Sequence, residues 1–381
     1  MTIRRMLVVV FALAIVASAC GDDGDAGDTT TAAPGTTAAP VDTTQPPATT
    51  MAPTTTMSDI PADWPDTLVF GFVPSQEVTE LQDDVDTFAQ ILTDALGITV
   101  TGEVTTDYTG LGVALGTGGA DMGAFGPAGF ILARQTYPNI ELLAQSVRFG
   151  DSTYHGQYFT NDASICGADP VEGAFYYDDS NAVVPVAATD TPALQVGYMF
   201  EDGLVRNEAL SPPMACPEPV DLSVVAGKIM AFTTETSTSG YIFPVLELRN
   251  AGITDDQYEA IFSGGHDAAV QAVYDGTADI GVSFDDARAT IAETNTDVGE
   301  QVIVFNITSR ISNDVIAVRG DLPQSLKDAL FQAMADYIST EEGQAVMEQL
   351  YSWTDLTRAD ATTDESLVLV EQAIAELGYT E

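Results

Sequence analysis

The sequence predicts an α/β protein of two lobes, each a mostly parallel sheet flanked by helices. Short β-rich runs alternate with helical runs through short connections, which is typical of a parallel sheet with helices on both faces. The chain also contains a short internal repeat, in which "ALGTGGADMGAF" (114–125) aligns with "AVYDGTADIGVS" (272–283). A helix end, a glycine and an Ala-Asp strand start recur once in each half, and two similar lobes are the simplest account. At 381 residues the chain has the length of about two domains.

In the first half, strands and helices are expected to alternate from residue 67 onward. Leu81, Val85 and Leu92 share one helical face, and Gly97 ends that helix. Pro127 falls in the first turn of another helix. The expected strands are 67–74, 98–104, 120–126 and 140–147, and the expected helices are 77–97, 108–119 and 127–137.

The second half repeats the alternation. Thr340 is the expected N-cap of a late helix. The two aspartates of the repeat, Asp121 and Asp279, are interpreted as residues that start a strand rather than as ligands. The expected strands are 228–234, 260–265, 278–284 and two runs within 302–318, and the expected helices start at Ser239 or cover 267–276, 322–339, 340–351 and 364–378.

Residues 1–19 have the features of an export signal. "MTIRR" is basic, and the apolar run "MLVVVFALAIV" is too short to span a membrane comfortably. The "ASAC" that follows is similar to a bacterial lipobox, except that Ala17 stands where Leu is usual. Cys20 would then be lipidated, and plain secretion with cleavage nearby is the alternative. Residues 20–65 are rich in Thr, Pro and Ala without apolar periodicity, which predicts a disordered stalk.

The charge of the chain disfavours two kinds of partner. Acidic residues number 57 against 12 basic ones, a formal net charge of −45. Such a surface repels nucleic acid and anionic lipid headgroups, so we expect contact with the membrane through the lipid anchor only. Solubility in a salty medium is the plainest reason for the charge. An anion site remains compatible with it, because surface charge is screened within about 10 Å.

Two cysteines remain besides Cys20. Cys166 and Cys216 form an even pair in an exported protein, which predicts a disulfide, and two buried free thiols are the alternative. The pair brackets a stretch without a clear period, about 166–218, which is interpreted as an insertion.

No catalytic, metal or cofactor motif stands out. The sequence has two histidines, His155 and His266, and it lacks a Walker loop, a GxSxG elbow and Cys/His metal spacing. A secreted hydrolase that pairs Ser237 or Ser239 with His266 is kept as an alternative, although no spacing favours it. We therefore expect a binding protein with no catalytic residue, no metal and no cofactor.

Residues 235–241, "ETSTSGY", predict an anion site where a strand turns into a helix. The first turn of a helix has unpaired N–H groups and a partial positive charge. Ser237, Thr238 and Ser239 add hydroxyl donors, and Gly240 leaves room for close approach, so a tetrahedral oxyanion could be held without a lysine. An ordinary helix cap with spare hydroxyls is the alternative.

Two further helix starts repeat this arrangement. His266 follows Gly264 and Gly265, and it is either a donor to an oxyanion or an exposed ring beside a capping Asp267. Tyr108 opens a helix after a strand, and it is either a phenol donor in a cleft or an aromatic side chain that packs the lobes. Because strand ends and helix starts meet at the crevice of such sheets, we expect these residues to lie together.

Several motifs, taken in order, resemble those of the phosphate-, phosphite- and phosphonate-binding proteins of ABC importers. They are the signal with its lipobox-like cysteine, "DYTGLGVAL", "GGADMGAFGPAGFILA", "STSGYIFP" and "FSGGHDAAVQAVYDGTADIGV". The resemblance covers most of 66–350 apart from the insertion. It implies a type II periplasmic-binding-protein fold, in which two α/β lobes are hinged by two crossing strands and a cleft closes on the ligand.

The resemblance also implies roles for individual residues. The three hydroxyls would hold the phosphonyl oxygens, and a tyrosine and a histidine would complete the cage from either side. Asp285, within 283–286, matches an acidic contact to a substrate amine, whereas Phe130 stands where the family often has Tyr and implies one phenol donor fewer. The implied ligand residues are Tyr108, Tyr154, Ser237, Thr238, Ser239, His266 and Asp285.

The expected function is that of a monomeric, lipid-anchored binding protein on the outer face of the cytoplasmic membrane. It would deliver a small phosphorus oxyanion (phosphonate, phosphite or phosphate) to an ABC permease with its cytoplasmic ATPase. The expected segments are 66–160 for the first lobe, 161–304 for the second lobe with its insertion, and 305–381 for the return to the first lobe. Besides the hydrolase, a ligand-sensing or adhesion module on the same fold is the remaining alternative.

Overall fold

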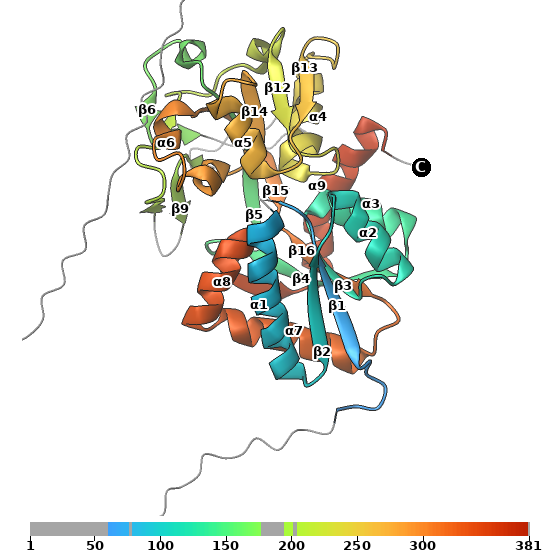
Figure 1. The fold of residues 1–381 in the computed structure, drawn as a ribbon. Coiled ribbons are helices and arrows are strands. Elements are labelled where there is room, and N and C mark those ends of the chain that lie inside the picture. The colour runs from blue at the N-terminus through green and yellow to red at the C-terminus, as the bar shows by residue number, and fades with distance from the viewer. Residues whose placement is uncertain (1–59, 76–77, 177–193, 201–203, 380–381) are drawn as a thin grey trace, which may run out of the picture. The chain divides into compact units, whose positions relative to one another are not determined.

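The computed structural model describes residues 60–75, 78–176, 194–200 and 204–379 (Figure 1). The expected signal peptide, Cys20 and most of the expected stalk lie outside these residues. The last part of that stretch, 60–65, lies inside them. There Trp64 packs against the core of the first lobe and donates from Nε1 to Ser325 Oγ at 2.9 Å. Within the described residues, no helix is both long enough and apolar enough to cross a bilayer.

The first lobe is built on a six-stranded sheet in the order β17-β4-β16-β3-β1-β2. β1 pairs in parallel with β2 and β3, whereas β16 and β17 run antiparallel to their neighbours. The strands are β1 (Thr67–Phe72), β2 (Thr99–Val104), β3 (Met122–Phe125), β4 (Ile140–Val147), β16 (Val315–Arg319) and β17 (Asp355–Arg358). The flanking helices are α1 (Val78–Leu96), α2 (Tyr108–Thr117), α3 (Pro127–Thr136), α7 (Gln324–Ile338) and α8 (Glu341–Tyr351).

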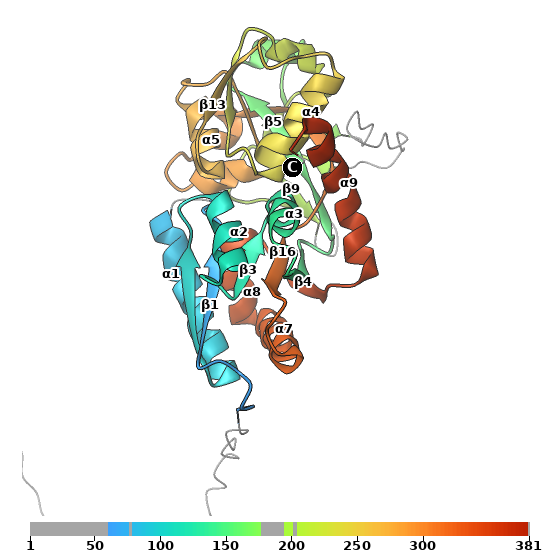
Figure 2. The same cartoon turned by 90° about the vertical axis from the view of Figure 1, so that its right-hand side faces the viewer.

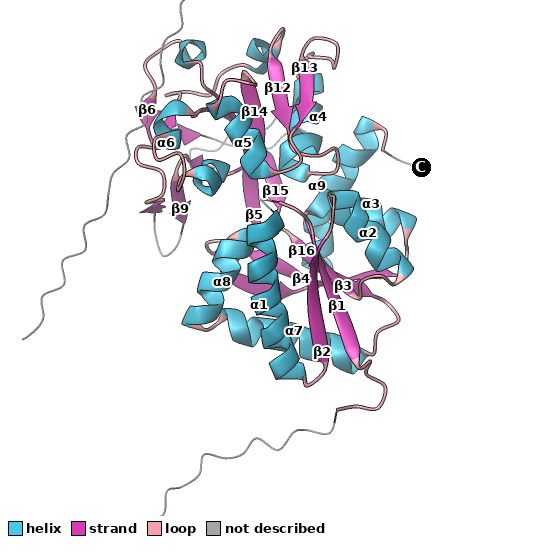
Figure 3. Cartoon of the chain, viewed as in Figure 1, coloured by secondary structure: helices cyan, strands magenta, loops and turns pink. Residues whose placement is uncertain are grey.

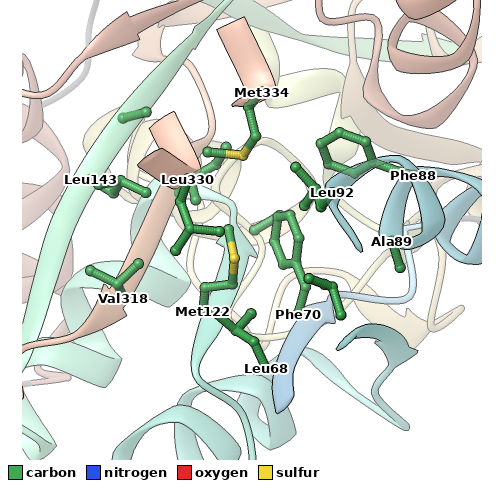
Figure 4. Close-up of a cluster of buried hydrophobic side chains, with 14 of the residues drawn as sticks. Leu68, Phe70, Phe88, Ala89, Leu92, Met122, Leu143, Val318, Leu330 and Met334 are labelled. Carbon is green, nitrogen blue, oxygen red and sulfur yellow. The ribbon is translucent and has the colours of Figure 1, made fainter. Parts of the chain in front are cut away.

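Alternating burial explains why this sheet forms where it does. Leu68 and Phe70 lie two residues apart on β1, and both point into the core that α1, α7 and α8 cover (Figure 4). Phe88 and Leu92 meet them from α1 at the spacing of one helical turn. Helices α2 and α3 cover the opposite face of the sheet, around Phe125.

The second lobe is built on a seven-stranded sheet in the order β13-β12-β14-β5-β15-β11-β6. β12 pairs in parallel with β13 and β14, and β5 runs antiparallel to both β14 and β15 (Figure 3). The strands are β5 (Thr153–Thr160), β6 (Val171–Glu172), β11 (Met214–Ala215), β12 (Ile229–Phe232), β13 (Glu259–Phe262), β14 (Ile280–Phe284) and β15 (Ile303–Ser312). The helices are α4 (Phe243–Asn250), α5 (His266–Tyr274) and α6 (Val298–Gln301).

Two crossing segments join the lobes. Residues 148–152 lead from β4 to β5, and residues 313–314 lead from β15 to β16, so both β5 and β15 belong to the second sheet. The sheets thus place the crossings before 153 and after 312, whereas the sequence suggested boundaries at 160 and 304. Arg148 forms an ion pair with Asp314 across the two segments. The last helix, α9 (Ala361–Leu377), packs against both α3 and α4 (Figure 2).

The insertion is integrated into the second lobe. A disulfide joins Cys166 and Cys216, whose Cα atoms are 5.0 Å apart. β11 pairs in parallel with β15, and β6 pairs with β11, so the insertion lengthens the second sheet at one edge. Two small ribbons complete its described part: β7 (Phe175–Tyr176) with β8 (Leu194–Gln195), and β9 (Tyr198–Phe200) with β10 (Leu204–Arg206).

Candidate functional site

A cavity of about 650 Å³ lies between the two lobes. Both sheets direct their strand ends and helix starts toward it, as expected for α/β folds. The ligand residues suggested by the sequence all contribute to its lining: Tyr108, Tyr154, Ser237, Thr238, Ser239, His266 and Asp285.

The three hydroxyl residues lie at a π-helical turn that continues into α4. The turn covers Thr238–Ile242, and Ser237 caps it by accepting from Gly240 N at 3.2 Å. Ser237, Thr238 and Ser239 are each no more than 3 % exposed. The need for glycine at position 240 has a different cause from the one expected. A Cβ there would lie 2.0 Å from Thr233 Oγ1, so the glycine allows the turn to pack on the end of β12 rather than admitting a ligand. π-Helical turns occur often at functional sites.

Two hydrogen bonds connect the lobes at helix starts. Thr238 Oγ1 accepts from Ala128 N, in the first turn of α3, at 3.0 Å. His266 N, at the start of α5, donates to Ser75 O at 2.9 Å. In both cases an N–H group without a partner inside its own helix is satisfied from the other lobe. The structure therefore holds the lobes in contact around the cavity.

His266 is a neutral imidazole in this setting. Its Nδ1 lies 2.7 Å from Ser283 Oγ, and its ring stands edge-on to Phe284. Burial, with a smaller effect from the charge of Arg148, lowers its pKa to about 3. The assignment in which Ser283 donates to Nδ1 places the ring proton on Nε2, where it can be donated to a bound anion.

The two tyrosines are buried phenol donors. Tyr108 is the first residue of α2, and burial raises its pKa well above its ordinary value. Burial also raises the pKa of Tyr154. Both phenols therefore remain protonated under physiological conditions and can donate to an anion.

Asp285 lies where β14 ends, beside β5. Its N–H donates to His155 O at 3.1 Å, and its Oδ1 accepts from His155 N at 3.4 Å. Burial raises its pKa to about 8, although the nearby charge of Arg148 opposes the shift. The carboxyl group is therefore mostly protonated at neutral pH.

Arg148, which the sequence did not single out, supplies a cation to the cavity. Its side chain is 12 % exposed and is paired with Asp314. The guanidinium lies over the ring of Tyr154 at 4.9 Å, and its Nε has no hydrogen-bond partner among the described residues. The chain has only 12 basic residues, so an arginine directly after a predicted strand was the available signal.

Phe130 does not take part in the cavity. It is wholly buried in the first lobe, with the guanidinium of Arg134 4.8 Å from its ring centre, and it is not among the lining residues. The ring of Phe130 therefore does not border the observed cavity.

The geometry does not assemble the hydrolase considered above. Among the described residues, the hydrogen-bond partner of His266 Nδ1 is Ser283 rather than Ser237 or Ser239. In the same part of the chain, no group of His, Cys, Asp and Glu side chains has the arrangement of a metal site.

Two α/β lobes, two crossing segments and a cavity between helix starts define the class of two-lobed binding proteins. Within that class, residues 70–364 match the family described as "ABC transporter, phosphonate, periplasmic substrate-binding protein". The chain belongs to this family. Members of this family are the substrate-binding components of ABC transporters.

Individual relatives are distant in sequence. The phosphate-import protein PhnD of Mycolicibacterium smegmatis is 24 % identical over 231 residues, which are 58 % of this chain and 56 % of the relative. The structure of PhnD1 from Prochlorococcus marinus in complex with methylphosphonate is similar at a TM-score of 0.61 and 18 % identity, over 83 % of this chain and 99 % of the other. A binding protein component of an ABC phosphonate transporter from Pseudomonas aeruginosa has a TM-score of 0.57 and 16 % identity, over 82 % and 98 %.

Proposed function

We propose that this chain is a lipid-anchored binding protein that captures a small phosphorus oxyanion between its lobes. One observation carries the proposal: residues suggested by separate motifs line a single cavity, and their groups are buried hydrogen-bond donors. The ligand class is supported by relatives named for phosphate import and solved with methylphosphonate.

The donors act together on the phosphonyl oxygens. Ser239, Tyr108 and the Nε2–H of His266 donate from separate sides. Arg148, whose charge is balanced by its ion pair with Asp314, adds its Nε–H, which has no partner among the described residues. Each hydrogen bond to a charged group contributes about 1.5–3 kcal/mol. An analogue that leaves one of these buried donors unpaired binds more weakly, and this is the source of selectivity.

Asp285 is the contact for an amine on the ligand. In the absence of a cation its carboxyl is mostly protonated, because burial raises its pKa to about 8. An ammonium group at this position would favour the charged form and drive the proton off. Binding of an aminophosphonate is therefore accompanied by proton release, whereas binding of methylphosphonate is not.

The N-terminal segment attaches the protein to the membrane. Lipidation of Cys20, followed by the stalk of 20–65, holds the binding domain at the outer face. Replacement Cys20→Ser should move the protein from the membrane fraction to the medium or periplasm. Retention of the variant in the membrane fraction would argue against the anchor.

Calorimetric titration tests the ligand class. The folded protein is titrated with phosphate, phosphite, methylphosphonate and aminoethylphosphonate, and at least one of them should bind at a stoichiometry of one. If none of the four gives a binding signal while the thermal melt shows a folded protein, the proposal is contradicted. Release of a new product during titration would favour the hydrolase instead.

A further inference from the structure

The donors Tyr108, Ser239 and His266 form the part of the cavity that we call the cage. From the cage, the cavity continues toward the insertion. This part is lined from three elements: β5, the turn η4 (Ala287–Ile291) and the ribbon strands of the insertion. Its lining includes Gln157, Leu194, Tyr198, Asn207, Ala289 and Thr290, which we call the annex.

The size of the cavity exceeds the needs of a bare oxyanion. Sites of about 300–1,000 Å³ usually take ligands of drug-like size. At about 650 Å³, the cavity falls inside this range, and a single phosphate would fill a small part of it. Side chains of the annex border part of the remaining space.

Gln157 provides a second and independent observation. The residue is 1 % exposed, and neither Oε1 nor Nε2 has a hydrogen-bond partner among the described residues. A buried amide without partners is unfavourable, and each such group in a native protein calls for an explanation. Gln157 pairs in register with Ser283, whose hydroxyl contacts His266. The unpaired amide therefore lies beside the imidazole wall of the cage.

The insertion is held firmly against the cage. Arg288 Nη1 donates to Met214 O at 2.8 Å, while its Nε and Nη2 bind the carboxylate of Asp286 at 2.9 and 2.6 Å. Asp286 directly follows Asp285 of the cage. Tyr198 and Asn207 thus border the same space as the donors of the cage, although they come from a segment outside the repeated lobes.

We propose that the annex binds the organic substituent of the ligand, so that the substrate is a phosphonate whose substituent ends in a hydrogen-bonding group. Gln157 pairs with that group, and the insertion closes around the carbon chain. This inference rests on the proposed function of the cage.

Calorimetric titration with three phosphonates distinguishes the contribution of the cage to binding from that of the annex. The three ligands are methylphosphonate, propylphosphonate and hydroxypropylphosphonate. Hydroxypropylphosphonate should bind wild type at least tenfold more tightly than methylphosphonate. Ala289→Leu should fill the annex, remove this advantage and change the Kd of methylphosphonate by less than threefold. Ala329→Leu, at a half-buried position of α7 outside the cavity lining, is the matched control.

Gln157→Met is a second variant that does not depend on filling the annex. It removes an unpaired buried amide, so the Tm of the ligand-free protein should not fall. The preference for hydroxypropylphosphonate over propylphosphonate should disappear. A role in folding alone would lower the Tm and leave this preference unchanged.

The outcomes distinguish the two proposals. If no phosphonate binds the folded wild type, the function proposed for the cage is wrong, and this inference fails with it. If methylphosphonate binds but hydroxypropylphosphonate binds no tighter, the function proposed for the cage is retained and the role proposed for the annex is wrong. Equal weakening of all ligands by Ala289→Leu, or an unchanged preference in Gln157→Met, would also overturn the annex.

Discussion

Burial sets the protonation state of the individual groups in the cavity. It raises the pKa of Tyr108, lowers that of His266 to about 3 and raises that of Asp285 to about 8. All three groups are therefore mostly neutral at pH 7. The cavity lining also has charged side chains, among them the ion pair of Arg148 with Asp314 and the guanidinium of Arg310. Neutral donors beside a guanidinium suit an anion whose charge is spread over several oxygens.

Removal of a single hydroxyl should weaken ligand binding strongly. In Ser239→Ala, the oxyanion loses one buried donor, which corresponds to about 1.5–3 kcal/mol, or roughly 10–100-fold in Kd. Titration with the best-binding phosphorus oxyanion measures the change. The exposed Ser339→Ala at the end of α7 is the control and should leave the Kd unchanged. A loss below twofold in Ser239→Ala would remove this residue from the cage.

The raised pKa of Asp285 predicts how stability depends on pH. Between its ordinary value of 3.8 and about 8, the folded state holds a proton that the unfolded state releases, so stability falls as pH rises. His266 acts in the opposite direction below pH 6.5, because its lowered pKa makes the unfolded state bind more protons there. Above pH 6.5 the effect of Asp285 is no longer offset by His266.

Asp285→Asn should therefore flatten the stability profile between about pH 6.5 and 8. Urea unfolding at several pH values in this window measures the slope for wild type and variant. An equal slope in both proteins would show that Asp285 titrates with an ordinary pKa. The exposed Asp66→Asn serves as the control and should retain the wild-type slope.

Among the elements, those whose apolar residues recur at a regular spacing were predictable from the sequence, and those without such a spacing were not. The spacing of Leu81, Val85 and Leu92 indicated α1, and Thr340 caps α8 as expected by accepting from Gly343 N at 3.0 Å. The π-helical turn after Ser237 has no period that marks it. β6 and β11 have 2 residues each, too few for alternation to appear, so their places in the second sheet could not be predicted.

The internal repeat has the same hydrogen bonds in both lobes. Asp121 Oδ2 accepts from Val69 N and Asp279 Oδ2 accepts from Ile229 N, each at 2.8 Å. Each aspartate lies just before a strand and ties it to the parallel neighbour of that strand, β1 in the first lobe and β12 in the second, so the interpretation of these residues as structural is confirmed. The repeat also aligns Tyr108 with His266, since α2 and α5 begin at these residues.

Replacement of either aspartate should therefore destabilise the domain. Asp121→Ala or Asp279→Ala leaves a strand N–H without its carboxylate, which costs about 1–3 kcal/mol. Urea unfolding measures the loss, and the exposed Asp66→Ala should cause a much smaller one. Ligand affinity should change little in either variant, because neither side chain lines the cavity. A large loss of affinity at unchanged stability would contradict this structural role.

At the scale of the molecule, the sequence suggested the site but not the contacts that complete it. Tyr108, Ser239 and His266 were accessible to prediction because each opens a helix after a strand. The pair of Arg148 with Asp314 was not, because these residues are 166 positions apart and meet only where the crossing segments run side by side. The contribution of the insertion to the cavity could likewise not be predicted, because its short strands show no regular spacing of apolar residues.

The disulfide should stabilise the second lobe. It closes a loop of 50 residues between Cys166 and Cys216, for which the chain-entropy model gives about 4 kcal/mol. The double variant Cys166→Ser/Cys216→Ser should lose most of this in urea unfolding. Wild type in reductant should behave like the variant. A loss below about 1 kcal/mol would show that the insertion is held mainly by other contacts, such as those of Arg288.

The central claim is that a phosphorus oxyanion occupies the cavity between Tyr108, Ser239 and His266. Nitrogen-detected NMR of the imidazole groups tests it most directly, because the chain has two histidines. We predict that His266 stays neutral between about pH 5 and 8, since its pKa is lowered to about 3. Its ring N–H resonance should shift on saturation with methylphosphonate or phosphate. A His266 that titrates near pH 6.5, or a ring resonance unmoved while calorimetry reports bound ligand, would contradict the account.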